Sequence, residues 1–380
     1  MSDLFFYGTL CHKPLLEIVL GRTAGCIDAR PGRLPDHAVF WARDEVFPLI
    51  APAPGQNTPG LLVRGLDAED LARLNFYEGG FGYGRETVQL TLENGEFAAA
   101  EVFFPEPGLW TPGDPWSLTD WAARWGALSC RAATEAMGYF GRIGPAELAL
   151  RFPAIRRRAA SWLAAQASPA DPAHDAVHDV RLIDHRFAHL NFHGIEEARI
   201  QFRRHDGAMS PELDRSALMT GAAAVVLPYD PVRDTVLLIE QFRAPLYLAG
   251  DPAPWLWEPV AGLIDPGETP EQTAHREAME EAGLVLRNLE KVGEAYSSSG
   301  SSGEFVHLYV GIADLTGAEG IGGLASEGED IRSAAVRFDA LIAAIDAHRH
   351  RDMPLLVTAL WLARHRERLR TGAGVSSFGQ

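Results

Sequence analysis

GLIDPGETPEQTAHREAMEEAGL, residues 262–284, is the stretch of sequence that decides the fold of the C-terminal half. Thr269 can cap a helix, Pro270 suits the first helical position, and Gln272 completes a capping box with the threonine. Gly283 is a typical helix stop. The sequence therefore predicts a short helix with well-defined ends, entered from a glycine-containing loop.

Carboxylates gather on one face of this predicted helix. Glu277 and Glu281 are four residues apart, so their Cβ atoms lie about 5–6 Å apart, with Glu280 beside them. Like charges so placed need either full solvation or a cation, and hard carboxylate oxygens select Mg²⁺ or Mn²⁺. A solvated acidic helix is the competing explanation.

The spacing of the fixed residues favours the metal site. Reading from Gly262, the order fits the pattern GX5EX7REUXEEXGU at every fixed position, and it resembles the box of the Nudix hydrolase superfamily. The resemblance implies that Arg276 braces the acidic residues and that the glycines permit a loop–helix–loop turn.

The segments around the box predict an α/β (α+β) fold. AAAVVLPYD (222–230) and TVLLIEQFR (235–243) have strand composition and a turn between them, which indicates a hairpin. FVHLYVGIAD (305–314) predicts another strand, and two apolar-periodic segments, 338–349 and 354–369, predict helices.

Residues from about 178 to 370 resemble the ADP-ribose pyrophosphatase branch of that superfamily, which implies an α/β/α sandwich with a mixed sheet. It also implies hydrolysis of ADP-ribose to AMP and ribose 5-phosphate with Mg²⁺, or Mn²⁺. The site residues implied by position are the metal ligands Ala261 (carbonyl), Glu277, Glu281 and Glu329, the general base Glu327, the further catalytic carboxylate Glu280, and the substrate-binding Arg215, Arg243 and Glu304. Bridging cations would neutralise the phosphate oxygens and lower the pKa of the attacking water.

One departure leaves the substrate open. The ADP-ribose-specific members have a proline about fifteen residues after the box, where this chain has Ser299. Another nucleoside diphosphate derivative, such as NADH or a nucleotide sugar, is therefore an alternative substrate. A sensor that binds ADP-ribose without cleaving it is a further alternative, although such sensors usually lose the glutamates kept here.

Composition bounds the class of protein. The chain has 380 residues, enough for two domains, and 47% of them are hydrophobic, as in globular proteins. The net charge of -17 argues against nucleic-acid binding, so a diphosphate substrate requires bound cations and a few placed arginines. The chain has three cysteines, which lack C-x-x-C spacing, and it has no apolar run long enough to span a membrane. We therefore expect a cytoplasmic protein.

The N-terminal half carries a second motif. DLFFYGTL (3–10) predicts a strand that ends in a glycine loop, and Glu78 precedes a glycine-rich segment. The pair resembles the γ-glutamylcyclotransferase-like superfamily, which implies a mixed β-barrel with helices. By position, Tyr7, Gly8, Thr9 and Leu10 form the anion cradle and Glu78 is the acid/base residue. The alternative is that Glu78 only stabilises a loop.

The sequence AQASPADPAHDA (165–176) has neither helix nor strand periodicity and is typical of a linker. We therefore expect a γ-glutamylcyclotransferase-like domain at 1–166, a linker at 167–177 and a Nudix domain at 178–380. This tandem arrangement resembles bacterial tellurite-resistance proteins of the TrgB type. Members of the pyrophosphatase branch are dimers that exchange N-terminal strands, which implies a homodimer.

Overall fold

The computed structural model of the chain describes residues 1–324 and 328–376. The chain divides into two compact units, Met1–Met219 and Thr220–Gln380, and each is described by itself. In the described ranges, no helix is long and apolar enough to cross a membrane.

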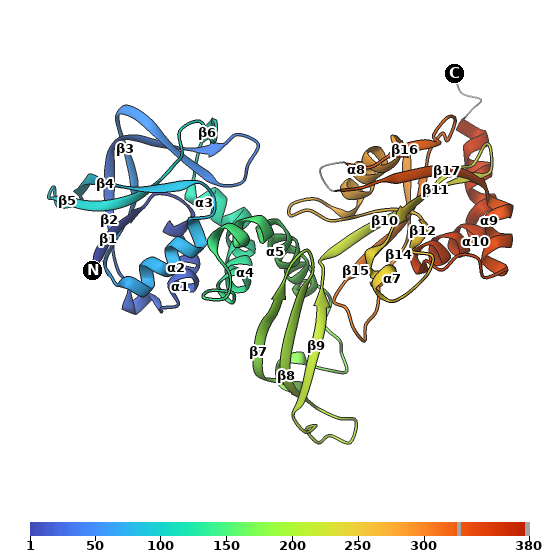
Figure 1. Cartoon of the computed structure of the whole chain (residues 1–380), viewed down its shortest axis with the longest axis horizontal. Helices are drawn as coiled ribbons and strands as arrows, with labels where there is room; N and C mark the ends of the chain where they lie inside the picture. The colour runs from blue at the N-terminus through green and yellow to red at the C-terminus, as the bar shows by residue number, and fades with distance from the viewer. Residues whose placement is uncertain (325–327, 377–380) are drawn as a thin grey trace. The chain divides into compact units, whose positions relative to one another are not determined.

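A five-stranded closed barrel begins the first unit (Figure 1). Its strands are β1 (Ser2–Phe6), β2 (Asp28–Ala42), β3 (Pro48–Leu66), β4 (Tyr83–Leu92) and β5 (Phe97–Pro105), and β6 (Pro112–Pro115) pairs with β2. The strand order β3-β1-β5-β4-β2 closes through pairing of β2 with β3. Because β1 pairs in parallel with β5 and antiparallel with β3, the barrel is mixed, as predicted.

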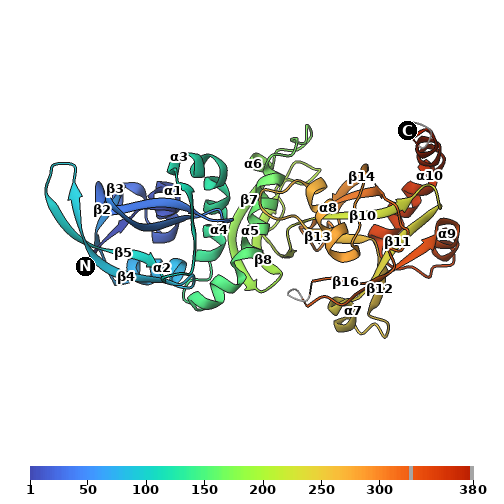
Figure 2. The same ribbon diagram turned by 90° about the horizontal axis from the view of Figure 1, so that it is seen from above.

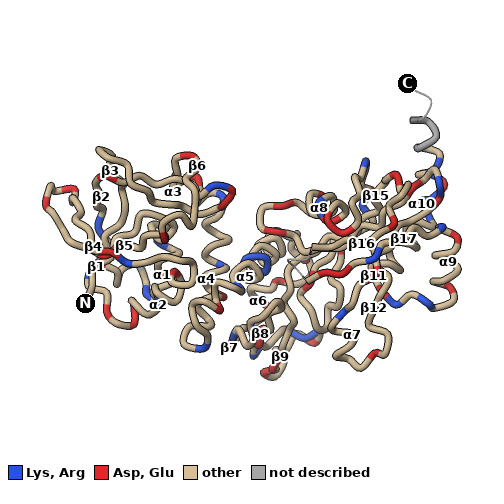
Figure 3. The backbone as a smooth tube through the Cα atoms, turned by 45° about the horizontal axis from the view of Figure 1, so that its top comes forward, with Lys and Arg blue, Asp and Glu red and all other residues tan. Residues whose placement is uncertain are grey.

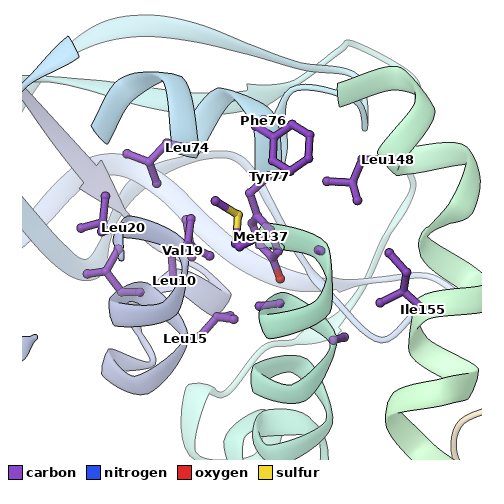
Figure 4. Packing of buried hydrophobic residues seen from close by; sticks show 14 of the residues in the cluster. Leu10, Leu15, Val19, Leu20, Leu74, Phe76, Tyr77, Met137, Leu148 and Ile155 are labelled. Carbon is purple, nitrogen blue, oxygen red and sulfur yellow. The ribbon is translucent and has the colours of Figure 1, made fainter. Parts of the chain in front are cut away.

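Helices close over this barrel and enclose the largest apolar core of the unit. They are α1 (Lys13–Leu20), α2 (Ala68–Glu78), α3 (Leu118–Trp121), α4 (Ala127–Met137) and α5 (Pro145–Gln166), with short turns η1 (Thr9–Cys11), η2 (Ala24–Cys26) and η3 (Ala122–Gly126). Figure 4 shows Val19 from α1, Leu74 and Tyr77 from α2, Met137 from α4 and Ile155 from α5 converging between the helices. Burying apolar area of this kind is the main stabilising contribution to the unit.

A three-stranded antiparallel sheet completes the first unit. After α6 (Ala176–Asp179), its strands β7 (Val180–Leu190), β8 (Gly194–Phe202) and β9 (Leu213–Met219) pair in that order. Phe187 and Leu190 of β7 are buried in the helical core, which explains why the sheet groups with the N-terminal unit. The two compact units meet at residue 219. The domain boundary expected at residue 178 stays a prediction.

The second unit contains a mixed sheet. Its strands are β10 (Ala222–Asp230), β11 (Thr235–Phe242), β12 (Trp255–Glu258), β13 (Val260–Leu263), β14 (Asn288–Tyr296), β15 (Phe305–Ile312), β16 (Gly320–Gly322) and β17 (Ile331–Arg337). The main order is β14-β15-β10-β11-β17-β16, with β12 paired to β11 and β13 to β10. β10 and β15 run parallel and the other pairs are antiparallel. The hairpin predicted from residues 222–243 is confirmed.

Helices cover both faces of this sheet (Figure 2). α8 (Pro270–Ala282) packs on one face through Ala274 and Ala278, both fully buried against Ile239. α9 (Phe338–Asp346) and α10 (Met353–Ser376) pack on the other face, and α7 (Ala244–Leu248) follows β11. The α/β/α sandwich is confirmed, and it explains why β10, covered on both sides, is apolar along almost its whole length.

Candidate active site

Helix α8 begins and ends where the sequence predicted. Oγ1 of Thr269 accepts a hydrogen bond from the Gln272 N–H at 3.2 Å, and Oε1 of Gln272 accepts one from the Thr269 N–H at 2.8 Å. Gly283 adopts φ 62°, a left-handed conformation that glycine tolerates without a Cβ clash. These caps fix which residues face the sheet and which carry the acidic face.

Arg276 braces the acidic side chains of the box. Its Nε and Nη2 donate to the two carboxylate oxygens of Glu268 at 2.9 and 3.0 Å. Its Nη1 donates to Glu277 at 2.6 Å and to Glu280 at 3.0 Å. Nη2 also reaches the carbonyl of Leu263 at 3.2 Å. One guanidinium therefore ties the preceding loop to the carboxylates of α8, an arrangement that suits its planar set of donors.

Strand β13 lies against the carboxylates of α8. An ideal Cβ placed on Gly262 would lie 1.8 Å from Oε1 of Glu277, so only glycine allows this approach. The neighbouring N–H of Ala261 donates to Oε2 of Glu281 at 3.1 Å. Gly322 of β16 similarly lies against the Glu281 carbonyl, where a Cβ would be 2.2 Å away. Acidic positions on α8 are visible in Figure 3.

Glu281 is a buried carboxylate. It is 2% exposed, and burial raises its pKa to about 9, with smaller increases from the charges of Glu277 and Glu329. Burial also raises the pKa of Glu277. A negative charge in such a place is unfavourable unless a cation accompanies it.

Glu329, the fourth expected metal ligand, follows a glycine turn. Its Oε2 accepts a hydrogen bond from the Leu324 N–H at 3.0 Å. Gly323, which precedes Leu324, has φ 92°, and Gly328, which precedes Glu329, has φ 74°. The charge of Glu329 acts on both Glu277 and Glu281, so the three carboxylates belong to one electrostatic cluster. Glu327, the expected general base, lies outside the described residues.

The donor set fits a hard divalent cation in its chemistry. It consists of carboxylate oxygens and a backbone carbonyl, which are the ligands that Mg²⁺ and Mn²⁺ prefer. Within residues 1–324 and 328–376, no three His, Cys, Asp or Glu side chains converge closely enough to form a metal-binding group. Instead Glu277 and Glu280 bond to Arg276, and Glu281 bonds to the backbone of β13.

Known proteins resemble this half of the chain. The NUDIX domain family model matches residues 219–354. The ADP-ribose pyrophosphatase of Escherichia coli (strain K12) is 38% identical over 192 residues, which cover 50% of this chain and 91% of that protein. The chain belongs to the Nudix family.

Two further relatives of this half of the chain differ from each other in the substrate that their names give. The ADP-ribose pyrophosphatase of Haemophilus influenzae is 35% identical over 166 residues, 43% of this chain and 76% of that protein. The GDP-mannose pyrophosphatase of Pectobacterium atrosepticum is 32% identical over 178 residues, 47% of this chain and 88% of that protein.

The N-terminal half has its own family match. The family model described as "Gamma-glutamyl cyclotransferase, AIG2-like" matches residues 4–123. Both predicted resemblances, and the fold classes that they implied, are therefore confirmed. The names of these relatives do not mention tellurite resistance, which stays a prediction.

Arg243 of the Nudix unit has a buried partner that sequence reasoning missed. Its Nε lies 2.8 Å from Oε1 of Glu258, and Nη2 also bonds to that carboxylate. Glu258, at the end of β12, is 5% exposed. Burial raises the pKa of nearby Asp352 to about 6. The pairing of β11 with β12 creates this contact, and no local motif around residue 258 indicates it.

Arg215 lies in the first compact unit, on β9. Its side chain is exposed, and Nη1 donates to the carbonyl of Asp214 at 2.8 Å. The second unit, which holds the Nudix box, begins at Thr220. The predicted substrate contact of Arg215 stays a prediction.

The loop that carries Ser299 is held by its own serines. Oγ of Ser298 and Oγ of Ser301 lie 2.9 Å apart, and Oγ of Ser302 accepts from the Glu304 N–H at 3.1 Å. The Glu304 carbonyl accepts from the Ser297 N–H at 3.1 Å. Hydrogen bonds therefore shape the turn in which the branch usually has proline.

The predicted cradle of the first unit is a tight turn at the end of β1. The Tyr7 hydroxyl donates to the carbonyl of Phe103 at 2.9 Å. A Cβ on Gly8 would lie 2.8 Å from Cγ of Pro48, so a larger residue would disturb the turn. Thr9 begins η1, and Leu10 is buried in the helical core, so Leu10 can offer only its backbone.

Glu78, the last residue of α2, has a perturbed carboxyl group. Burial raises its pKa to about 7, and its charge raises the pKa values of Tyr7 and Tyr83. The predicted acid/base role of Glu78 stays a prediction. A carboxyl group that titrates near neutrality is suited to proton transfer.

Proposed function

We propose that this chain is a divalent-metal-dependent pyrophosphatase that hydrolyses ADP-ribose to AMP and ribose 5-phosphate. The observation that carries the proposal is the cluster around buried Glu281, with Glu277 pressed against Gly262 and braced by Arg276. The ADP-ribose pyrophosphatases of similar sequence support this substrate.

The metal in this proposal is Mg²⁺, with Mn²⁺ as a substitute. Its ligands would be the carbonyl of Ala261 and the carboxylates of Glu277, Glu281 and Glu329. When bound, the cation supplies positive charge to the phosphate oxygens and acidifies water. It also offsets the cost of keeping Glu281 ionised in a buried position.

The chain's own residues then orient the substrate and move a proton. Glu258 holds Nε and Nη2 of Arg243. In this proposal Arg243 would contact a phosphate oxygen, and Arg215 would contribute a second guanidinium. Water adds to one phosphorus, the bridging P–O bond breaks, and Glu327 accepts the proton that the water loses. Glu280 assists by keeping Arg276 in place.

A substrate panel tests the proposal with the full chain. ADP-ribose, NADH and GDP-mannose are incubated with Mg²⁺, and products are separated by chromatography, with Glu281→Gln as the control. We expect AMP and ribose 5-phosphate from ADP-ribose at the highest kcat/KM. Preferred cleavage of GDP-mannose or NADH would support the alternative substrate class, and binding without product would support a sensor.

The first unit supports a second candidate activity, γ-glutamyl cyclisation. It is supported by the carboxyl group of Glu78 at the end of α2, whose pKa burial raises to about 7, and by the tight turn at Gly8 after β1. Release of 5-oxoproline from γ-glutamyl donors by the parent protein, lost in Glu78→Gln, would support this activity. No release from any donor would leave Glu78 with a structural role only.

A cytoplasmic homodimer completes the proposal. Light scattering of the purified chain tests the oligomeric state, and fractionation of cells that produce it tests the location. A monomer at micromolar concentration would contradict the first part, and recovery in a membrane or secreted fraction would contradict the second.

A further inference from the structure

Helices α4 and α5 lie between the two segments that the family models match. The γ-glutamyl cyclotransferase match ends at residue 123 and the NUDIX match begins at residue 219. Both helices nevertheless pack into the core of the first unit, where Leu148 and Ile155 of α5 belong to the same buried cluster as Tyr77 (Figure 4). Tyr77 immediately precedes Glu78. The two helices are therefore part of the surroundings of the predicted acid/base residue.

The first turn of α5 lies directly against the segment that follows Glu78. A Cβ on Gly80 would lie 2.2 Å from the carbonyl oxygen of Pro145 and 2.8 Å from Cβ of Ala149. Because Pro145 contributes backbone to this contact, only glycine allows so close an approach. The backbone after Glu78 therefore takes its position from α5.

Phe152 of α5 contacts residues before and after Glu78 in the chain. Its ring lies edge-on to the Tyr77 ring, with centroids 6.0 Å apart, and edge-on to the Phe81 ring at 5.4 Å. Phe152 is itself partly buried against the helical core. Aromatic pairs of this kind bury large apolar areas in a defined geometry. The Phe152 ring therefore covers the end of α2 that carries Glu78.

Glu78 is half-buried, so a small molecule can reach it although protein surrounds most of the side chain. Burial is what raises its pKa to about 7, so the increase depends on the groups that pack around the carboxyl group. Three phenols respond to its charge, those of Tyr7, Tyr77 and Tyr83. Helices α4 and α5 contribute Cys130 and Arg156, whose charges act on Tyr77.

We propose that α4 and α5 complete the Glu78 site, with Phe152 as a positioning residue that keeps bulk water from the Glu78 carboxyl group. This inference rests on the second candidate activity, because it takes Glu78 as the acid/base residue. Phe152 acts through the burial of Glu78 and is not itself a catalytic residue.

The chemistry of cyclisation gives this burial a purpose. The α-amino nitrogen of the γ-glutamyl donor forms a bond to the γ-carbonyl carbon, and the amide C–N bond breaks. One proton must therefore pass from the attacking amine to the leaving amine. A single carboxyl group that titrates near neutrality can accept and return this proton, whereas a solvated glutamate is a weaker acid/base catalyst at that pH.

The test uses the full chain labelled with carbon-13 at its glutamate carboxyl groups, and the Glu78 signal is the one that Glu78→Gln lacks. Phe152→Leu, Phe152→Val and Phe152→Ala remove increasing volume from one place. We expect the midpoint of the Glu78 titration to stay near that of the parent with leucine and to fall by about one pH unit or more with alanine, because water then reaches the carboxyl group. Valine should give an intermediate midpoint, which decides the matter if the alanine variant does not fold.

Leu150→Ala is the matched control, because Leu150 lies on the same helix and is 70% exposed. Equal midpoints in the folded Phe152 variants overturn the inference, and so does an equal decrease in Leu150→Ala. A loss of thermal stability without a change in midpoint also overturns it, since Phe152 would then serve packing alone.

Release of 5-oxoproline, measured against pH in the same proteins, separates the inference from the candidate activity. Its midpoint should move with the Glu78 titration. If the parent protein releases no 5-oxoproline from any γ-glutamyl donor, the candidate activity fails, and the catalytic part of the inference fails with it. The carbon-13 titration still decides whether α5 protects Glu78 from water.

Discussion

Oε1 of Glu277 lies 1.8 Å from the place where a Cβ of residue 262 would stand, so the carboxylate occupies space that only glycine leaves free. The contact joins strand β13 to helix α8 and determines how closely the Glu277 side chain can approach the backbone of β13. The same strand holds Glu281 through the N–H of Ala261. Both carboxylates therefore take their positions from one short strand.

Replacing Gly262 by alanine should disable the site with little loss of fold. The new methyl group must displace the Glu277 carboxylate, so we expect kcat/KM to fall at least about 100-fold, since active-site misplacement of about 1 Å has that order of effect. Circular dichroism checks that the helices persist. Gly293→Ala is the control, because a Cβ there meets nothing within 4 Å. Parental activity in Gly262→Ala would contradict the prediction.

Replacing Arg276 by methionine should affect both activity and stability. Glu268, Glu277 and Glu280 lose their shared partner, and partly buried carboxylates left unpaired repel one another. We expect a loss of about 1–3 kcal/mol in the free energy of unfolding, together with weaker metal binding. Arg332→Gln, which removes a more exposed ion pair with Glu240, should be close to neutral. Equal effects of the two substitutions would argue against a bracing role.

Glu281→Gln should stabilise the metal-free protein while abolishing hydrolysis. Burial raises the pKa of Glu281 to about 9, well above that of the unfolded chain. Near neutral pH the unfolded chain therefore ionises this group whereas the metal-free folded chain keeps it protonated, and this proton uptake on folding costs stability. The amide removes this cost. In EDTA we expect a melting temperature a few degrees higher, corresponding to about 1 kcal/mol. A lower melting temperature in EDTA would show that the carboxylate is stabilising without metal.

The N-terminal unit should become less stable as pH rises toward neutrality. Burial raises the pKa of Glu78 from 4.5 to about 7, so between these values the unfolded chain releases a proton that the folded chain keeps. Stability from this group is complete below the lower value and is lost as pH rises to the higher one. Glu78→Gln should therefore gain on the parent, by on the order of 1 kcal/mol, as the pH increases. A difference in melting temperature that does not change with pH would contradict this.

The sequence was sufficient to predict α8 because its signals are local. Thr269, Gln272 and Gly283 lie within the segment that they delimit, and the box spacing specifies which side chains share a face. The hairpin and the flanking helices were predictable for the same reason. Strands and helices space their apolar residues differently, and this spacing can be seen within each segment.

Contacts between distant segments were not predictable. Glu258 holds Arg243 only because β12 pairs with β11, and Gly262 approaches Glu277 only because β13 packs under α8. Similarly, phenylalanine is common in strands, and nothing in the sequence around Phe187 indicates that this residue is buried in the helical core of the first unit. Such contacts depend on tertiary packing, which a single sequence does not encode in short patterns.

Manganese binding, measured by electron paramagnetic resonance with a non-hydrolysable ADP-ribose analogue present, tests most directly whether the carboxylates of α8 collect divalent cations. We expect the parent chain to bind Mn²⁺ and Glu281→Gln to bind it at least about 10-fold more weakly, since loss of a charged ligand has about that effect or more. Equal Mn²⁺ affinity in both proteins would contradict the account.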